Sequence, residues 1–399
     1  MLRLELGELI ATRGGSIKTG PFGTTLKAHE YSAVGVPIIS VGEIGYGSFR
    51  VHHSTPRAPK QVVTRLPEYL LVEGDIVFAR KGGVDRSAWV SSEQGGWFLG
   101  SDGIRVRLPS DVNSRFVAYQ LQLPESRGWL LQHASGSTMP SLNQGILERI
   151  PLALPDLDTQ CKVVEVLEAL DAKIGINNAQ AATVDAYLDA LSERLFANCR
   201  GEVRLDEIAD INSEGIKPVP GGNLRYVDIA SVGIGRYDYP KLSAWDGAPG
   251  RARRRLRRGD TLWSTVRPNR RSHALNLSDD PALVGSTGLA VLRPRDVGFA
   301  YLYQVSTRPN FSSYLESVAE GSAYPAVRAE RFAEARVPLA ASVDREAFEA
   351  IAAPMREHVH SLQAECRELA TLRDELLPAL MSGDLRVKDA GRVDQEVAE

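Results

Sequence analysis

The sequence predicts an α+β protein in which two mixed α/β domains are separated by two long helices that form an antiparallel coiled coil. Three observations support this fold class: an internal two-fold repeat, short β-patterned runs in each half of the chain, and a heptad seam after each half. A chain of 399 residues is also too long for one ordinary core, which favours two or three domains.

The internal repeat consists of three blocks of similar sequence that recur at one offset. Each block returns 185 residues later: Leu71–Phe78 at Leu256–Trp263, Gly100–Val106 at Gly285–Val291, and Gly136–Pro140 at Gly321–Pro325. Near the start the offset is 199, where Leu6–Leu9 matches Leu205–Ile208 and Ile17–Lys18 matches Ile216–Lys217. Similarity on this scale indicates two copies of one architecture with loops of different length.

Both halves contain short runs rich in Val, Ile and aromatic residues, bounded by Gly, Pro and Asp. This pattern predicts strands at Val36–Val41, Ile76–Ala79, Ile104–Leu108, Tyr226–Ala230 and Leu289–Leu292. We also expect a helix around Arg115–Gln122. Each half is therefore predicted to begin with a mixed α/β domain.

A long helix is predicted after each of these domains. In the first, steps of four and three alternate without a break through Val163, Leu167, Leu170, Ile174, Asn177, Ala181, Val184, Leu188, Leu191 and Leu195. The second seam is less regular: Ile351, Met355, His358, Leu362, Glu365, Leu369, Leu372 and Leu376, with Val359 and Cys366 able to fill the polar positions. Such seams indicate helices that pack on each other. Asn177 either fixes the register of the seam or marks a bend near Gly175.

These patterns divide the chain into five segments. The predicted order is a first domain at 1–155, a first long helix at 156–200, a second domain at 201–342, a second long helix at 343–384 and a polar tail at 385–399.

Composition excludes several classes of protein. No apolar run approaches the roughly 20 residues of a membrane span, and the N-terminus does not resemble a signal peptide, so we expect a cytoplasmic protein. The three cysteines, Cys161, Cys199 and Cys366, lie far apart, which supports neither a zinc site nor a disulfide framework.

Charge is unevenly distributed although the net charge is only −3. Residues 251–271 contain nine arginines and one aspartate, whereas residues 156–197 contain eight acidic residues and three basic ones. This asymmetry predicts one surface for a polyanion and another that avoids it.

The order of segments resembles the specificity subunit of type I restriction-modification systems. The motifs that carry the resemblance are Gly136–Pro140 leading into Ile150–Pro155, then Gln160 with Leu170–Ile174, and the closing run Leu372–Val387. The second half departs from the pattern, because Val337–Ala341 lacks the second proline and no matching glutamine follows.

The resemblance implies a DNA-binding subunit whose two domains are target recognition domains, each reading one half of a split DNA site. It implies two methyltransferase subunits and restriction/translocase subunits as partners, docked on the helices. It implies no cofactor in this chain, with S-adenosylmethionine on the methyltransferase subunit and ATP and magnesium on the restriction subunit. The second docking surface is not expected to match the first in every detail.

Searches for catalytic motifs found none. Neither an Asn-Pro-Pro-Tyr nor an Asp-Pro-Pro-Tyr run for base methylation is present, and no phosphate-binding loop of the GxxxxGK[ST] type occurs. Pro155-Asp156 with Asp171-Ala-Lys173 superficially resembles a nuclease metal site, but Asp171 and Lys173 fall on the first long helix, facing away from its seam. We therefore predict no catalytic and no metal site. The alternatives are a stand-alone DNA nuclease or methyltransferase, or a coiled-coil DNA-binding adaptor without modification partners.

The candidate DNA-binding residues lie in loops and segments rich in glycine or basic residues. Arginine can bind the guanine edge and asparagine the adenine edge, while other basic residues hold phosphates. The candidates are Lys18, Arg80, Lys81, Arg86, Arg254, Arg255, Arg267, Asn269 and Arg270.

Overall fold

The computed structural model describes residues 2–23, 25–136, 138–197, 199, 201–321 and 324–385. Parts of three predicted motifs lie outside the described residues: Ser137, Ser322 and Ala323 of the two repeated loops, and Arg386 and Val387 of the closing run. The predicted polar tail is also outside them, apart from Leu385. The chain divides into two compact units, Met1–Lys173 with Glu368–Glu399 (unit 1) and Ile174–Arg367 (unit 2).

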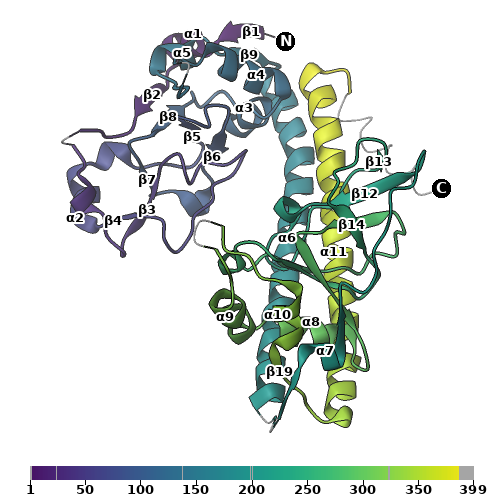
Figure 1. Ribbon diagram of the computed structural model, residues 1–399. Coiled ribbons are helices and arrows are strands. Elements are labelled where there is room, and N and C mark those ends of the chain that lie inside the picture. The colour runs from purple at the N-terminus through teal and green to yellow at the C-terminus, as the bar shows by residue number, and fades with distance from the viewer. Residues whose placement is uncertain are drawn as a thin grey trace. The chain divides into compact units, whose positions relative to one another are not determined.

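Unit 1 contains a four-stranded sheet of order β2-β8-β5-β6, a three-stranded sheet of order β4-β3-β7 and the pair β1-β9 (Figure 1). The strands are β1 (Leu2–Glu5), β2 (Ser16–Thr19), β3 (Val36–Ile39), β4 (Arg57–Ala58), β5 (Ile76–Ala79), β6 (Ser87–Trp89), β7 (Phe98–Leu99), β8 (Gly103–Arg107) and β9 (Pro151–Leu154). The helices are α1 (Leu6–Arg13), α2 (Lys60–Arg65), α3 (Ser114–Gln120), α4 (Pro124–His133) and α5 (Gln144–Glu148).

Unit 2 repeats this topology with a four-stranded sheet of order β11-β18-β15-β16, a second sheet of order β13-β12-β17-β14 and the pair β10-β19. Its strands are β10 (Glu202–Arg204), β11 (Ala209–Ile211), β12 (Asn223–Val227), β13 (Ser243–Ala244), β14 (Ala252–Arg255), β15 (Thr261–Ser264), β16 (His273–Leu275), β17 (Leu283–Ser286), β18 (Leu289–Pro294) and β19 (Arg336–Pro338). Its helices are α7 (Leu205–Ile208), α8 (Phe299–Thr307), α9 (Pro309–Ser317) and α10 (Ala329–Glu334).

The predicted strands and the predicted helix are present. The run Ile76–Ala79 is β5 with the predicted bounds and is fully buried, which explains why it is apolar throughout. The other four runs overlap β3, β8, β12 and β18, and the predicted helix is α3.

Equivalent backbone hydrogen bonds support both offsets, with donors that are 199 residues apart and acceptors that are 185 residues apart. The Leu6 amide donates to the Ile150 carbonyl at 2.9 Å, and the Leu205 amide donates to the Ala335 carbonyl at 2.8 Å. Helices α6 (Leu157–Ala197) and α11 (Ser342–Ser382), each of 41 residues, begin 185 residues apart.

One predicted correspondence is wrong. Ile17 and Lys18 lie in β2, whereas the Ile216 amide donates to the Arg253 carbonyl, next to β14. The reason is that α1 has eight residues and α7 has four, so the strand after α7 begins earlier in the second copy.

Within each unit, α6 and α11 run side by side in opposite directions (Figure 1). In unit 1, Leu167 of α6 and Leu380 of α11 belong to one core, and in unit 2, Leu188 and Phe348 belong to another. All ten predicted seam residues of α6 are buried or half-buried, which confirms the seam. Asn177 is 1% exposed and donates to Glu365 at 2.8 Å, in a helix that continues unbroken past Gly175. It is therefore a buried polar seam residue, not a bend.

The predicted seam of α11 is partly wrong. Ile351 is 42% exposed, while Phe348 and Ala352, which the predicted seam did not include, are buried. His358 is exposed and Val359 is buried in its place, as the sequence allowed. This part of α11 packs against the core of unit 2 as well as against α6, so its buried face is wider than a strict heptad seam.

Candidate nucleic-acid interface

Three loops of unit 1 meet at one edge of its four-stranded sheet. Strands β2 and β5 both run antiparallel to β8, so they end at the same edge. The loop after β5 is held to the Gly136–Pro140 region, because the Gly82 amide donates to the Pro140 carbonyl at 2.9 Å. Lys81 also forms an isolated bridge with Ser141. The sheet thus presents a compact group of loops that contains most of the candidate residues of this half.

The cations at this edge differ in how far they are neutralised. Lys81 forms an ion pair with Asp102 at 3.5 Å. The Arg80 guanidinium lies 5.6 Å from the ring of Phe22, which is 64% exposed. Arg86 is half-buried at the far side of the same loop. Arg80 is also half-buried, and it donates to the Ser101 carbonyl at 3.5 Å. Unlike Lys81, neither Arg80 nor Arg86 has an ion pair among the described residues.

Lys18 lies apart from the loop after β5. It is in β2 opposite Arg105, and its ammonium lies 4.6 Å from the centre of the Tyr69 ring. This contact with an aromatic face holds the side chain over the sheet.

The equivalent edge of the four-stranded sheet β11-β18-β15-β16 in unit 2 carries different side chains. The Arg267 amide donates to the Pro325 carbonyl at 2.7 Å, and Val266 forms an isolated bridge with Ala326. These contacts lie 185 residues after those of Gly82 and Lys81. The Arg267 guanidinium lies 4.7 Å from the centre of the Tyr324 ring, and Asn269 and Arg270 are exposed. The structure therefore brings Arg267, Asn269 and Arg270 together on one loop.

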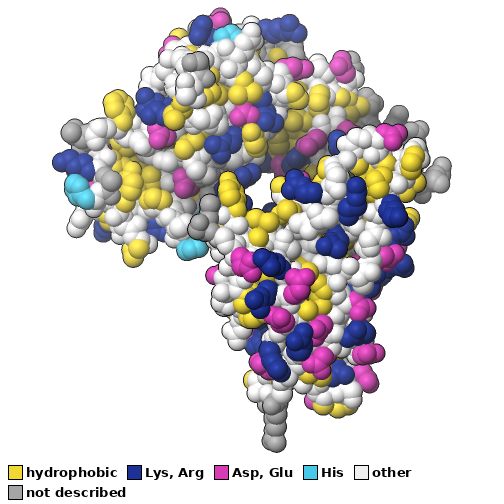
Figure 2. Space-filling view, viewed as in Figure 1, with side chains coloured by type: hydrophobic (Ala, Val, Ile, Leu, Met, Phe, Trp, Pro, Cys, Tyr) yellow, Lys and Arg dark blue, Asp and Glu magenta, His cyan; other side chains and the backbone are white. Residues whose placement is uncertain are grey.

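The arginine-rich segment 251–258 contains β14, which pairs with β17 in the second sheet of unit 2. In unit 1 the corresponding place holds a short turn at Pro67–Tyr69 and a single bridge between Leu70 and Phe98. Figure 2 shows dark-blue side chains crowded over the region of β12 and β14. The extra strand thus gives unit 2 its basic surface.

Much of this basic charge is neutralised inside the unit. Glu214 binds Arg257 at 2.6 Å, Arg293 at 2.9 Å and Arg255 at 3.5 Å. Hydrogen bonds from Arg257 and then Arg293 lower the pKa of Glu214 to about 2 although burial opposes the shift. Arg258 pairs with Glu357 at 2.8 Å. Burial lowers the pKa of Arg254, whose Nε atom has no hydrogen-bond partner in the described structure. Arg254 therefore differs from Arg255, which already has a carboxylate partner.

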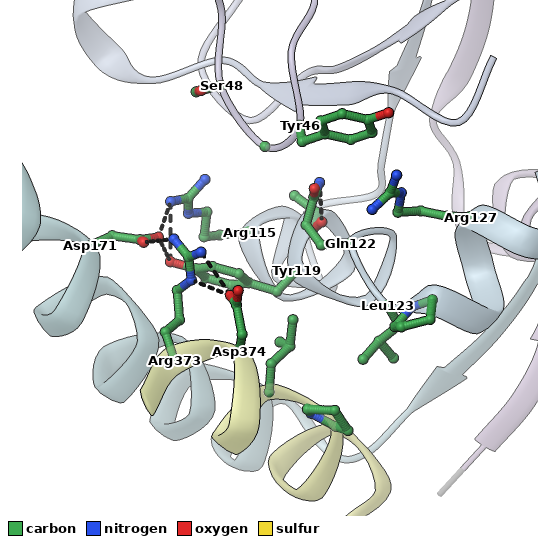
Figure 3. Close-up of a pocket in the computed structure, with 15 residues that line it drawn as sticks. Tyr46, Ser48, Arg115, Tyr119, Gln122, Leu123, Arg127, Asp171, Arg373 and Asp374 are labelled. Atoms are coloured by element: carbon green, nitrogen blue, oxygen red, sulfur yellow. Dashed lines mark hydrogen bonds and ion pairs between the residues drawn. The ribbon is translucent and has the colours of Figure 1, made fainter. Parts of the chain in front are cut away.

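A second site, which the sequence did not predict, joins the domain of unit 1 to the long helices. Asp171 of α6 accepts from the Tyr119 hydroxyl at 2.6 Å and from Arg373 of α11 at 2.8 Å (Figure 3). Arg115 also donates to Asp171, at 3.3 Å. These residues form one wall of a cavity of about 580 Å³, which Tyr46, Gln122 and Arg127 also line.

The expectation that Asp171 faces away from the seam is therefore wrong. It flanks the seam, and its side chain reaches both α3 and α11. The sequence alone does not show whether a residue beside an apolar seam faces solvent or another element. The residues that contact Asp171, Tyr119 and Arg373, are distant from it in the chain.

Unit 2 has an equivalent contact with the opposite charges. Arg356 of α11, 185 residues after Asp171, donates to Gln304 at 2.9 Å, and Gln304 is 185 residues after Tyr119. Arg356 also pairs with Asp185 of α6. The anion is thus on α6 and the cation on α11 in both units, but the residue that meets the domain is acidic in unit 1 and basic in unit 2.

The described residues do not form a centre suited to metal binding. Among them, no group of three or more His, Cys, Asp and Glu side chains could hold a metal ion. The cysteines are free, with Cys161 exposed and the other two half-buried. No described helix is long and apolar enough to cross a membrane.

The comparisons with known proteins agree with this architecture. Residues 15–186 match the model of the type I restriction modification DNA specificity domain. The type I restriction enzyme MjaVIII specificity subunit of Methanocaldococcus jannaschii is 21% identical over 336 residues, which cover 75% of this chain and 79% of that protein.

Solved structures give the same result for the fold. The type I restriction-modification S subunit from M. genitalium has a TM-score of 0.59 at 14% identity, with 95% of each chain covered. The HsdS subunit from Thermoanaerobacter tengcongensis is 18% identical, with 96% of this chain and 97% of that chain covered and a TM-score of 0.35.

These findings define a duplicated α+β protein in which mixed α/β domains alternate with long helices, the fold of a type I restriction-modification S subunit of known structure. Residues 15–186 are similar to the type I restriction modification DNA specificity domain, and the resemblance of the chain to the specificity subunits of type I restriction-modification systems is confirmed.

Proposed function

We propose that this chain reads a two-part DNA sequence, with one half of the site bound by the loop edge of each unit. The observation that carries the proposal is the repeated edge itself. Gly82 with Pro140 in unit 1, and Arg267 with Pro325 in unit 2, make the same backbone contact beside loops that present cations. Loops fixed on a rigid sheet are suited to hold side chains against base edges.

The candidate residues divide by the contacts they already have. Asn269 and Arg270 are exposed, and the half-buried Arg80, Arg254 and Arg267 have no carboxylate partner among the described residues. Lys81 and Arg255 each carry an intramolecular ion pair, so they would have to exchange a carboxylate for a phosphate. Lys18 and Arg86 are assigned to the same DNA-facing surface of unit 1.

The long helices are proposed to set the gap between the two half-sites and to dock the partners. These partners are two methyltransferase subunits and the restriction/translocase subunits. In this proposal S-adenosylmethionine binds to the methyltransferase subunit, ATP and magnesium bind to the restriction subunit, and this chain holds no cofactor. The complex is expected in the cytoplasm, where its DNA lies.

The experiment is single-molecule methylome sequencing of the host with and without this gene. The proposal predicts a methylated two-part motif that disappears on deletion and returns with the gene. A methylation pattern that is identical in both strains would contradict it. Cleavage or methylation by the purified chain alone, after removal of partners, would favour a stand-alone enzyme.

A further inference from the structure

Arg267 has a backbone conformation that glycine tolerates better than arginine. Its φ is 52°, in the left-handed region, and the equivalent residue of the first copy is Gly82 with a φ of 72°. Both residues donate their amide to the carbonyl of the equivalent proline, Pro325 or Pro140. The turn therefore requires this conformation in both units, and unit 2 meets the requirement with a strained residue.

A second difference between the two copies lies opposite the first. Tyr324, which is 70% exposed, occupies the position that Met139 occupies in unit 1. The Arg267 guanidinium lies over the Tyr324 ring at 4.7 Å. Arginine and tyrosine thus occur together in one copy, and glycine and methionine occur together in the other.

The Arg267 side chain is held without being neutralised. No ion pair or side-chain hydrogen bond joins its guanidinium to another residue in the part of the chain that the structure describes. Contact with the tyrosine face limits the motion of the guanidinium and leaves its five N–H groups available. Residues with this kind of backbone strain cluster at functional sites.

We propose that the Arg267–Tyr324 pair reads a guanine in the half-site bound by unit 2, and that unit 1 has no equivalent reader. The inference rests on the proposed DNA-reading function. A fixed guanidinium fork matches the O6 and N7 acceptors of guanine in the major groove. A phosphate contact would need only the positive charge, which lysine at a strain-free position would supply equally well.

The first test is selection of bound duplexes from a randomised DNA pool by the full chain, purified with the proteins that assemble with it in its host. With Arg267→Lys or Arg267→Gly, preference for one guanine of one half-site should fall about 5- to 150-fold, while the other positions stay unchanged. Tyr324→Met should weaken the same position less, because the guanidinium remains but loses its support.

The second test is thermal stability. Arg267→Gly should raise the Tm by about 2–4 °C, because it removes the strain. Asp296→Gly is the matched control: Asp296 is exposed, has a φ of 58° and follows the opposite end of β18. It should raise the Tm by a similar amount and leave base preference unchanged.

Three results would overturn the inference. One is unchanged base preference in both Arg267 variants. Another is an equal loss of affinity for all DNA sequences, with the slope of log binding constant against log salt concentration reduced by about 0.9. That result would make Arg267 a phosphate contact. The third is a lower Tm for Arg267→Gly. If the wild-type complex selects no sequence at all, the proposed function itself fails.

Discussion

Arg356 is the buried cation that connects the domain of unit 2 to both long helices. Its side chain is 7% exposed, pairs with Asp185, donates to Gln304 at 2.9 Å and lies 4.7 Å from the centre of the Tyr303 ring. Arg356→Met keeps an unbranched side chain that reaches about as far as the Nε atom of arginine and removes the guanidinium with its charge. It leaves Asp185 without its cation and Gln304 without its donor.

The expected loss of stability follows from the exposure of the two partners. Breaking a fully buried pair costs about 3–5 kcal/mol. The Asp185 side chain is 45% exposed, so water screens it and we expect about 2–3 kcal/mol for Arg356→Met. Burial already raises the pKa of Asp185 even though Arg356 opposes the shift, so this carboxyl can also take up a proton when the cation is lost.

Replacing the anion of this pair should destabilise the protein more than replacing the cation. Asp185→Leu leaves an arginine that cannot lose its proton in a nearly dry site. We therefore expect a larger loss than for Arg356→Met, by about 1 kcal/mol, and partial recovery in the double variant. The assay is a double-mutant cycle from urea unfolding and calorimetry. The exposed pair Arg258–Glu357 is the control, with an expected coupling below about 1 kcal/mol.

Additive losses for Arg356→Met and Asp185→Leu, within about 0.5 kcal/mol, would refute this reasoning. So would a coupling no larger than that of the Arg258–Glu357 control.

Two further predictions concern pH and salt. Burial, with Arg271 and Arg356 nearby, lowers the pKa of His273 from 6.5 to about 4. As the pH falls, the histidine is therefore protonated in the unfolded chain before it is protonated in the folded one, so the free energy of unfolding should fall between about pH 6.5 and pH 4. In His273→Gln, calorimetry should show that the Tm depends less on pH over that range. The same pH dependence in the variant and the wild type would contradict the assignment. If Arg270 holds one phosphate, Arg270→Ala should reduce the slope of log binding constant against log salt concentration by about 0.9. Arg257→Ala should leave this slope unchanged, because Glu214 already binds Arg257. Equal slopes for the two variants would contradict the assignment of Arg270 to a phosphate.

The sequence predicted those parts of the fold that depend on local pattern. The strand Ile76–Ala79 is apolar because it is buried on both faces, and the seam of α6 is regular because it packs along α11. The equivalent blocks at one offset predicted the repeated topology, since loops of equal length preserve register. The seam of α11 failed at Ile351 because that helix faces two partners in unit 2.

The sequence predicted the location of the candidate interface better than its contacts. The loop that contains Arg267 was identifiable from its basic residues, but its backbone strain became visible only by comparison with Gly82. The pairing of Arg255 and Arg257 with Glu214 was invisible, because about 40 residues separate these partners. The contacts of Asp171 and Arg356 depend on the packing of helices that are distant in sequence.

The central claim is that two recognition domains read two half-sites and that the long helices fix the gap. Insertion of one heptad in each helix, after Lys173 in α6 and after Arg367 in α11, follows the division between the units and preserves the heptad phase. Both helices must be lengthened, because within unit 2 Asn177 of α6 contacts Glu365 of α11 and within unit 1 Asp171 contacts Arg373. Seven residues add about 10.5 Å of helix, close to three base pairs at about 3.4 Å each.

Methylome sequencing of a host that carries this variant tests the claim most directly. The account predicts the same two half-site sequences separated by a gap about three base pairs longer. An unchanged gap would show that the helices do not set the spacing, and altered half-sites would show that base reading does not reside in the domains.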